Sequence, residues 1–354
     1  MKYRFFILFF NVTSFVSAQV LVDENRNPIP YVDIISNNNS LLWQTGLDGR
    51  IPTNVLKESK FNDSITFHHI SFNDLTIKSS NIKDSIFLIS RTYSLEEVII
   101  ESKTPKYQKI SACFRNTVIQ NGLPIYYSDG KTHYLTKKKI DFKLFRYEYR
   151  TYEIKNINDY VNNYKIGVPI NRAYTPIPEE KYLPYRFIKK HNLILLLKDS
   201  VTTDILTADS LKIGELKQQP DYLEYSVKNI FEIKTRKAIN TEVDITDFYI
   251  SMIFRGQLKD YKNILIEDFS QLVYLKTNYN INLKHDKEKE IRKVETIEEI
   301  FVENISYVNS VDEDYTKSRG MPRQSKYSYE FWNECDCDLY YIQNPRFFDS
   351  MQLK

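Results

Sequence analysis

The sequence predicts a mainly β protein, in which a small N-terminal β-sandwich precedes a larger β-rich α+β domain. Three observations lead to this fold class. Short runs of alternating apolar and polar residues are separated by turn residues, which is typical of all-β chains. The chain contains 27 Tyr and 21 Phe, and aromatic residues are enriched in strands. Its length of 354 residues fits about two domains of roughly 150 residues each.

The composition is that of a folded protein with nearly balanced charge. A hydrophobic content of 42% is enough for a packed core. The 49 Lys and Arg against 46 Asp and Glu give a net charge of +3, which lacks the strongly basic character of nucleic-acid-binding domains. We therefore expect no nucleic-acid partner. The 8 glycines are too few for Gly-rich phosphate-binding loops.

The first 18 residues have the features of a secretory signal peptide. Lys2 and Arg4 form the positive start, residues 5–10 the apolar centre, and residues 16–18 a small-residue cleavage site. The apolar run is shorter than the roughly 20 residues that cross a bilayer. We expect secretion across the inner membrane, and a mature protein that is periplasmic, outer-membrane-associated or extracellular. No transmembrane helix is expected after cleavage.

Residues 19–101 carry the strands of the predicted sandwich. Strands this short bury little surface alone, so they must stack as two sheets around one core. Two glycines, Gly46 and Gly49, permit a tight reversal between two of the strands. The expected strands are 19–23, 31–36, 41–45, 64–70, 72–78 and 85–90, with a further edge strand at 97–101.

Four segments of this region resemble, in order, the carboxypeptidase regulatory-like domain of bacterial cell-envelope proteins. They are PIPYVDI (28–34), TGLDGRI (45–51), HHISF (68–72) and LEEVII (95–100). The resemblance covers about residues 19–101 and implies a transthyretin-like, seven-stranded sandwich that is a structural or interaction module rather than a peptidase. In that family the last segment often precedes the plug of a TonB-dependent receptor. The roughly 250 residues that follow here are too few for a 22-stranded receptor barrel.

The five histidines do not form a zinc peptidase site. Such a site needs His-x-x-Glu and a third ligand further along the chain. Only His285 and Glu288 have the first spacing, and no histidine follows them. His68 and His69 are adjacent on a predicted strand, so we expect one packed and one exposed imidazole rather than a metal pair.

Beyond a linker at 102–106, residues 107–354 form the predicted β-rich α+β domain. Apolar residues at helical spacing predict a helix over 107–120, ended by Asn121-Gly122. A shorter helix is predicted at 204–216, and either a helix or a hairpin with a charged tip at 284–299. The other expected elements are strands at 139–154, 222–234, 241–254 and 270–283, loops at 174–186 and 310–325, and a final helix or strand at 327–332.

This second domain carries no recognised catalytic motif. The nucleophile elbow, the dinucleotide fingerprint, the Walker loop and H-E-x-x-H are all missing from the sequence. We therefore predict no catalytic residue, cofactor or metal. Paired carboxylates for glycoside hydrolysis stay open, because they have no fixed sequence spacing. Aromatic residues at 142–149, beside the basic residues 137–139, alternate as core residues do, and exposed ones could contact glycans.

The three cysteines form the one candidate thiol site. In an oxidising compartment Cys113 could pair with Cys335 or Cys337 and leave one thiol over. A bridge within 335–337 would be strained. Packed or solvent-exposed thiols are the alternatives, and the two thiols and three carboxylates of 334–338 leave a metal or redox role open.

We therefore predict a secreted, non-enzymatic cell-envelope protein with a structural or binding role, whose partners are other envelope proteins or glycans. One alternative is a hydrolase of envelope or extracellular polymers that uses the sandwich as an accessory. Another is a partner of an outer-membrane transporter that adds a strand at an exposed sheet edge.

Overall fold

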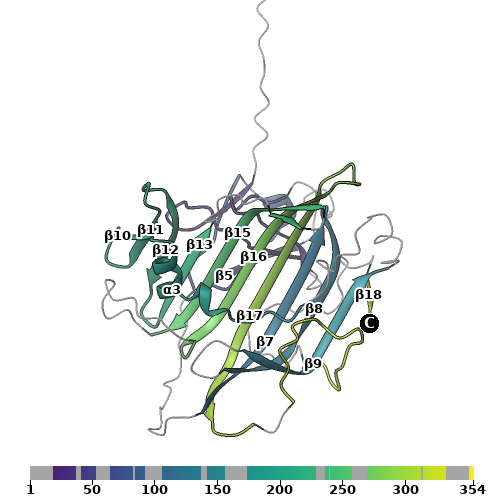
Figure 1. The fold of residues 1–354 in the computed structure, drawn as a ribbon. Coiled ribbons are helices and arrows are strands. Elements are labelled where there is room, and N and C mark those ends of the chain that lie inside the picture. The colour runs from purple at the N-terminus through teal and green to yellow at the C-terminus, as the bar shows by residue number, and fades with distance from the viewer. Residues whose placement is uncertain are drawn as a thin grey trace, which may run out of the picture. The chain divides into compact units, whose positions relative to one another are not determined.

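The structure is a computed structural model. It describes residues 19–36, 41–52, 64–82, 84–91, 106–136, 142–155, 174–228, 236–238, 240–256, 269–311, 314–331 and 351–354. These fall into two compact units that divide after Arg91, and each is described by itself. Strands dominate both units (Figure 1), which confirms the mainly β fold class. The predicted signal peptide, most of the 102–106 linker and the strand at 97–101 lie outside the described residues.

The first unit consists of two small sheets around one core. One sheet pairs β1 (Val20–Val22) in parallel with β6 (Ser85–Phe87). The other has the order β3-β2-β4-β5, formed by β2 (Asp33–Ser36), β3 (Leu41–Gln44), β4 (Ser64–His69) and β5 (Phe72–Lys78), after which η1 (Ser79–Asn81) follows. Each strand predicted between 19 and 90 is present. Leu21, Ile34, Phe67 and Ile86 come from both sheets and share one buried cluster.

The second unit is built on one large antiparallel sheet. Its strands are β7 (Tyr107–Gln120), β8 (Leu123–Thr136), β9 (Lys143–Ile154), β10 (Ile194–Leu197), β11 (Thr202–Leu206), β12 (Lys212–Gln218), β13 (Tyr222–Lys228), β14 (Arg236–Ala238), β15 (Thr241–Arg255), β16 (Leu272–His285), β17 (Arg292–Val308) and β18 (Met351–Leu353). The order across the sheet is β10-β11-β12-β13-β15-β16-β17-β7-β8-β9-β18, and β14 pairs with β15 beside this path. The long central strands run side by side in Figure 1.

The helix predicted over 107–120 is wrong, because this segment is the central strand β7. It lies between β17 and β8, and residues Ala112 to Val118 are buried without a break. A strand buried on both faces loses the alternation of apolar and polar residues, so its apolar residues matched a helical spacing by coincidence. Asn121 and Gly122 have φ of +50° and +80°, as in the two-residue hairpin turns that favour Asn-Gly. They join β7 to β8 rather than end a helix.

Two further predictions in this unit are also settled. The helix predicted at 204–216 is wrong, since the segment forms the β11–β12 hairpin. Ile205, Ile213 and Leu216 are buried on it, and Ser210 supplies the turn with a φ of +63°. At 284–299 the hairpin alternative is confirmed, because β16 and β17 meet there.

The loop predicted at 310–325 and the final element predicted at 327–332 carry little regular structure in their described residues. The described part of 310–325 is a loop, as predicted, and Thr316 bridges to Leu144 on β9. Residues 327–331 form neither an α-helix nor a strand, contrary to the prediction. The hydroxyl and backbone N–H of Ser328 donate to the Glu148 carboxylate. A side chain, rather than the backbone of a neighbouring strand, therefore accepts the hydrogen bond of this N–H.

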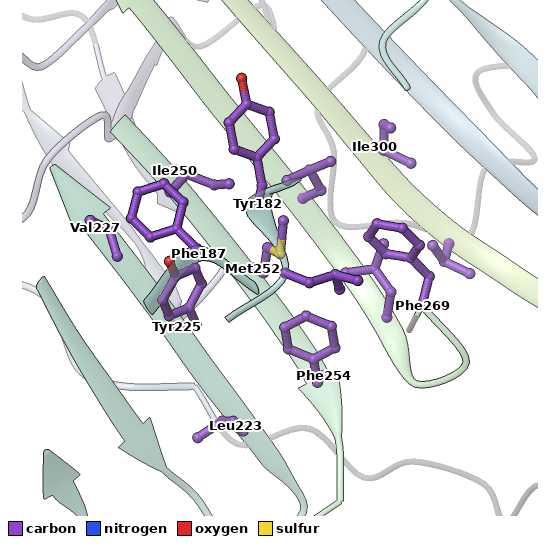
Figure 2. Close-up of a cluster of buried hydrophobic side chains, with 14 of the residues drawn as sticks. Tyr182, Phe187, Leu223, Tyr225, Val227, Ile250, Met252, Phe254, Phe269 and Ile300 are labelled. Atoms are coloured by element: carbon purple, nitrogen blue, oxygen red, sulfur yellow. The ribbon is translucent and has the colours of Figure 1, made fainter. Parts of the chain in front are cut away.

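One face of the large sheet carries the main hydrophobic core. The core is covered by η3 (Glu180–Tyr182) and α3 (Pro184–Lys190), the only α-helix in the described ranges. The loop predicted at 174–186 is therefore partly wrong, because η3 and the start of α3 lie within it. Pro184 occupies the first turn of α3, where proline is tolerated. Tyr182 and Phe187 join side chains of β13 and β15 in the cluster shown in Figure 2. Each large apolar side chain buried this way contributes about 1.5–3 kcal/mol.

Candidate functional site

The opposite face of the sheet centre carries a row of charged residues. Lys276, Glu299, Arg115, Asp129 and Arg150 lie on five neighbouring strands, β16, β17, β7, β8 and β9, and each stands directly opposite the next. Their charges alternate in sign along the row. All five are buried, with exposed fractions between 0% and 3%. We call these five residues the buried charge row.

Glu299 lies between Lys276 and Arg115 in the row and has three partners. Arg115 binds its Oε2 atom through both Nε and Nη2. The Tyr274 hydroxyl donates to Oε1 at 2.7 Å, and Lys276 Nζ lies 3.7 Å from the same oxygen. The carboxylate is therefore held by two cations and a hydroxyl in a site without solvent access.

Asp129 is the second acid of the row and lies between Arg115 and Arg150. Arg150 Nε donates to Asp129 Oδ1 at 3.0 Å, and Nη2 binds Oδ2, which gives a bidentate fork. The Tyr127 hydroxyl donates to Oδ2 at 3.1 Å. Burial raises the pKa of Tyr127 well above its usual range, and the charge of Asp129 adds to this effect. The phenol thus stays protonated and remains a donor.

This arrangement favours a structural role for the buried charge row. Removing ions from water is costly, and pairing compensates for the cost only when the geometry is good. Each row member has its counter-charge on the next strand, so a slip of one residue in register would bury unpaired charges. The row therefore fixes the register of the central strands.

A second polar cluster lies on the face that carries the main core. Arg319, from the loop at 310–325, contacts two carboxylates: Nη1 lies 3.3 Å from Glu179 Oε1, and Nη2 lies 3.1 Å from Glu298 Oε1. Thr277 Oγ1 donates to Glu298 Oε2 at 3.3 Å. The Tyr182 and Tyr279 hydroxyls hydrogen-bond to each other beside it. We call these six residues the Arg319 cluster.

Burial raises the pKa of Glu298 and of two tyrosines in this cluster. It raises the pKa of Glu298 above its usual value, and the opposing charge of Arg319 reduces this effect only partly. Burial also raises the pKa of Tyr279 well above its usual range, with Tyr182 as the next cause. A carboxyl group that holds its proton above the ordinary range can act as a general acid. Glu298 is the described residue that best combines such a shift with charged neighbours.

The candidate thiol site is described at one residue only. Cys113 lies on β7, fully buried, and is disulfide-bonded. Cys335 and Cys337 lie outside the described residues. The sequence predicts Cys113 on a helix, whereas the structure places it on the central strand β7. It lies two residues from Arg115 and on the same face of the sheet.

The histidines pack as ordinary core and turn residues. His68 and His69 are both buried, so the prediction of one exposed imidazole is wrong. The pairing of β4 with β5 shifts register near His69, and a bulge re-aims its side chain. His68 Nδ1 lies 2.7 Å from Asp74 Oδ1, and the Ser71 N–H donates to His69 Nδ1.

The His-x-x-Glu spacing and the aromatic stretch are also accounted for. His285 Nδ1 accepts the Lys287 N–H, and Glu288 binds Arg292 at 3.1 Å. Within the described ranges, no three or more His, Cys, Asp or Glu residues are grouped to hold a metal ion. Tyr149 is buried, as predicted, whereas Phe145 and Tyr147 are half-buried around the His133 ring.

The comparisons with known proteins identify no family. No family model matches the chain, and no curated protein matches it. Among solved structures, lipovitellin, in a structure titled "Lipid-protein interactions in lipovitellin", is similar with a TM-score of 0.25 and 9% identity. The match covers 64% of this chain and 28% of the lipovitellin chain, and a likeness this distant carries no functional argument. Among the described helices, none is long and apolar enough to cross a membrane.

Proposed function

We propose that this protein is an exported, non-enzymatic component of the bacterial cell envelope with a structural or binding role. Export is supported by the signal-like N-terminus and by the disulfide at Cys113, because disulfides persist in oxidising compartments. The resemblance of residues 19–101 to the carboxypeptidase regulatory-like domain supports an interaction module.

The buried charge row carries the non-catalytic part of this proposal. Its acids are each ion-paired across the strands. Buried ion pairs of this kind support a role in holding one strand register. Other envelope proteins or glycans are the expected partners of such a rigid sheet.

Cross-linking and affinity purification of the tagged protein from envelope extract tests the binding role. We expect one or more envelope proteins or glycans to be enriched over a matched tag-only control. Recovery of no envelope component would count against a binding role, and against the more specific alternative of an outer-membrane transporter partner.

The Arg319 cluster favours a second candidate, a hydrolase of envelope or extracellular polymers. The observation that favours a hydrolase is the raised pKa of Glu298, which shares Arg319 with a second carboxylate, Glu179. Incubation of the protein with peptidoglycan and with envelope polysaccharides tests it. Loss of activity in Glu298→Gln, but not in Glu303→Gln, whose carboxylate pairs with Lys131, would establish the enzyme. Absence of turnover in the unmodified protein would remove this candidate.

A further inference from the structure

One end of the large sheet is an apolar edge strand. The order of strands begins with β10, which pairs with β11 on one side, and among the described strands none pairs with its other side. β10 has the sequence ILLL. Ile194, Leu196 and Leu197 are 48%, 55% and 46% exposed, while Leu195 packs against the main core.

The strand lacks the devices that normally protect a sheet edge. Edge strands usually carry a charged side chain, a proline or a bulge that prevents pairing with another chain. β10 has neither charge nor proline, and its pairing with β11 runs in unbroken register from Ile194 to Leu197. The opposite end of the sheet differs: β18 includes Gln352, and the following Lys354 pairs with Glu153 on β9.

We propose that β10 pairs with β10 of a second copy of this chain, antiparallel about a two-fold axis. This pairing sets Leu195 opposite Leu195, Ile194 opposite Leu196 and Leu197 opposite Leu193 of the other copy, so that directly opposite side chains point to the same face of the sheet. Every position of the strand then meets an aliphatic side chain, and the same contacts occur twice, as a two-fold interface requires. Aliphatic cross-strand neighbours of this kind stabilise a sheet.

The charges that flank β10 favour this antiparallel arrangement. Lys189 and Lys190 precede the strand and are exposed, and Lys198 and Asp199 follow it. An antiparallel pair brings the two lysines of one copy to the end where the other copy carries Lys198 and Asp199, whose charges cancel. A parallel pair would place both lysine pairs together. The Val201 and Thr202 N–H groups donate to Asp199 Oδ1 at 2.9 and 2.7 Å, which holds the acid in place.

Light scattering after size exclusion, over a concentration series, tests the pairing. We expect a dimer of the unmodified protein at high concentration, and a dissociation constant at least tenfold larger for Leu196→Lys. The matched control is Leu211→Lys, because Leu211 is 64% exposed on the β11–β12 turn and outside β10. Leu211→Lys should dimerise like the unmodified protein.

Hydrogen exchange identifies the surface that pairs. The amides of 194–197 should become more protected as the protein concentration rises. A monomer at every concentration, including one that binds a different chain at this edge, would overturn the proposal. So would a dimer in which 194–197 gain no protection, or in which both lysine variants dissociate equally. The proposal depends on the sheet order and not on the proposed envelope function.

Discussion

Breaking the buried charge row should cost far more stability than breaking a surface ion pair. In Arg150→Met the bidentate fork to Asp129 is lost, and the carboxylate stays at 0% exposure. Removing one partner of a buried pair typically costs 3–5 kcal/mol. Asp129 keeps the Tyr127 hydroxyl at 3.1 Å and has Arg115 directly opposite, so we expect the lower half of this range, about 3–4 kcal/mol.

Removing both charges should restore much of that loss. In Asp129→Leu/Arg150→Met no buried charge lacks its partner, although the Tyr127 hydroxyl loses its acceptor, at a cost of about 1–3 kcal/mol. We therefore expect the double variant to be more stable than Arg150→Met alone by about 1–2 kcal/mol, with strongly non-additive effects.

Urea unfolding followed by near-ultraviolet circular dichroism measures these differences, because Tyr127, Tyr134 and Tyr225 are fully buried in the large sheet. Lys212→Met is the control. Lys212 is half-exposed and pairs with Asp204 and Glu215, so its loss should cost about 0–1 kcal/mol. The reasoning is refuted if Arg150→Met costs under about 1 kcal/mol, or if the double variant is no more stable than Arg150→Met.

Three further predictions concern other parts of the chain. Because burial makes the folded-state pKa of Glu298 higher than its unfolded value, folding favours the protonated form, and this stability is lost as pH rises through the folded pKa. The thermal midpoint of Glu298→Gln minus that of the unmodified protein should therefore increase from pH 5 to pH 8. A difference that stays constant or falls with pH contradicts this. Gly122→Ala should lower the free energy of unfolding in urea by about 1–2 kcal/mol. The cost comes from the φ of +80° alone, because no atom lies near an added Cβ. The control Gly320→Ala, in the loop, should cost less than about 0.5 kcal/mol. Unfolded protein should accept one alkylating group before reduction and three after it, given three cysteines and a bridged Cys113; three groups before reduction would exclude the disulfide.

The sequence predicted the short strands of the first unit, whose two faces differ, and failed at β7, where both faces are buried. The short strands of the first unit alternate apolar and polar residues, so the period of two identified them. β7 has no such alternation, since the residues from Ala112 to Val118 are all buried. Asn121-Gly122 was the signal that could have corrected it, because this dipeptide is also the strongest hairpin turn.

The two polar clusters were missed for a different reason. Arg115 and Glu299 are 184 residues apart in sequence, and only the pairing of β7 with β17 brings them together. A charged residue directly after Phe114 in a largely apolar run was the single local sign that Arg115 is buried. Arg319 lies in a polar segment that was predicted as a loop, and neither Glu179 nor Glu298 has a spacing that links it to Arg319.

Fractionation of cells that produce the full chain, with intact-mass analysis of each fraction, tests the proposed role most directly. The account predicts a protein that begins at Gln19, carries one disulfide and is recovered in the periplasmic, outer-membrane or extracellular fraction. A protein that retains Met1 and is recovered in the cytosol with three free thiols would contradict it.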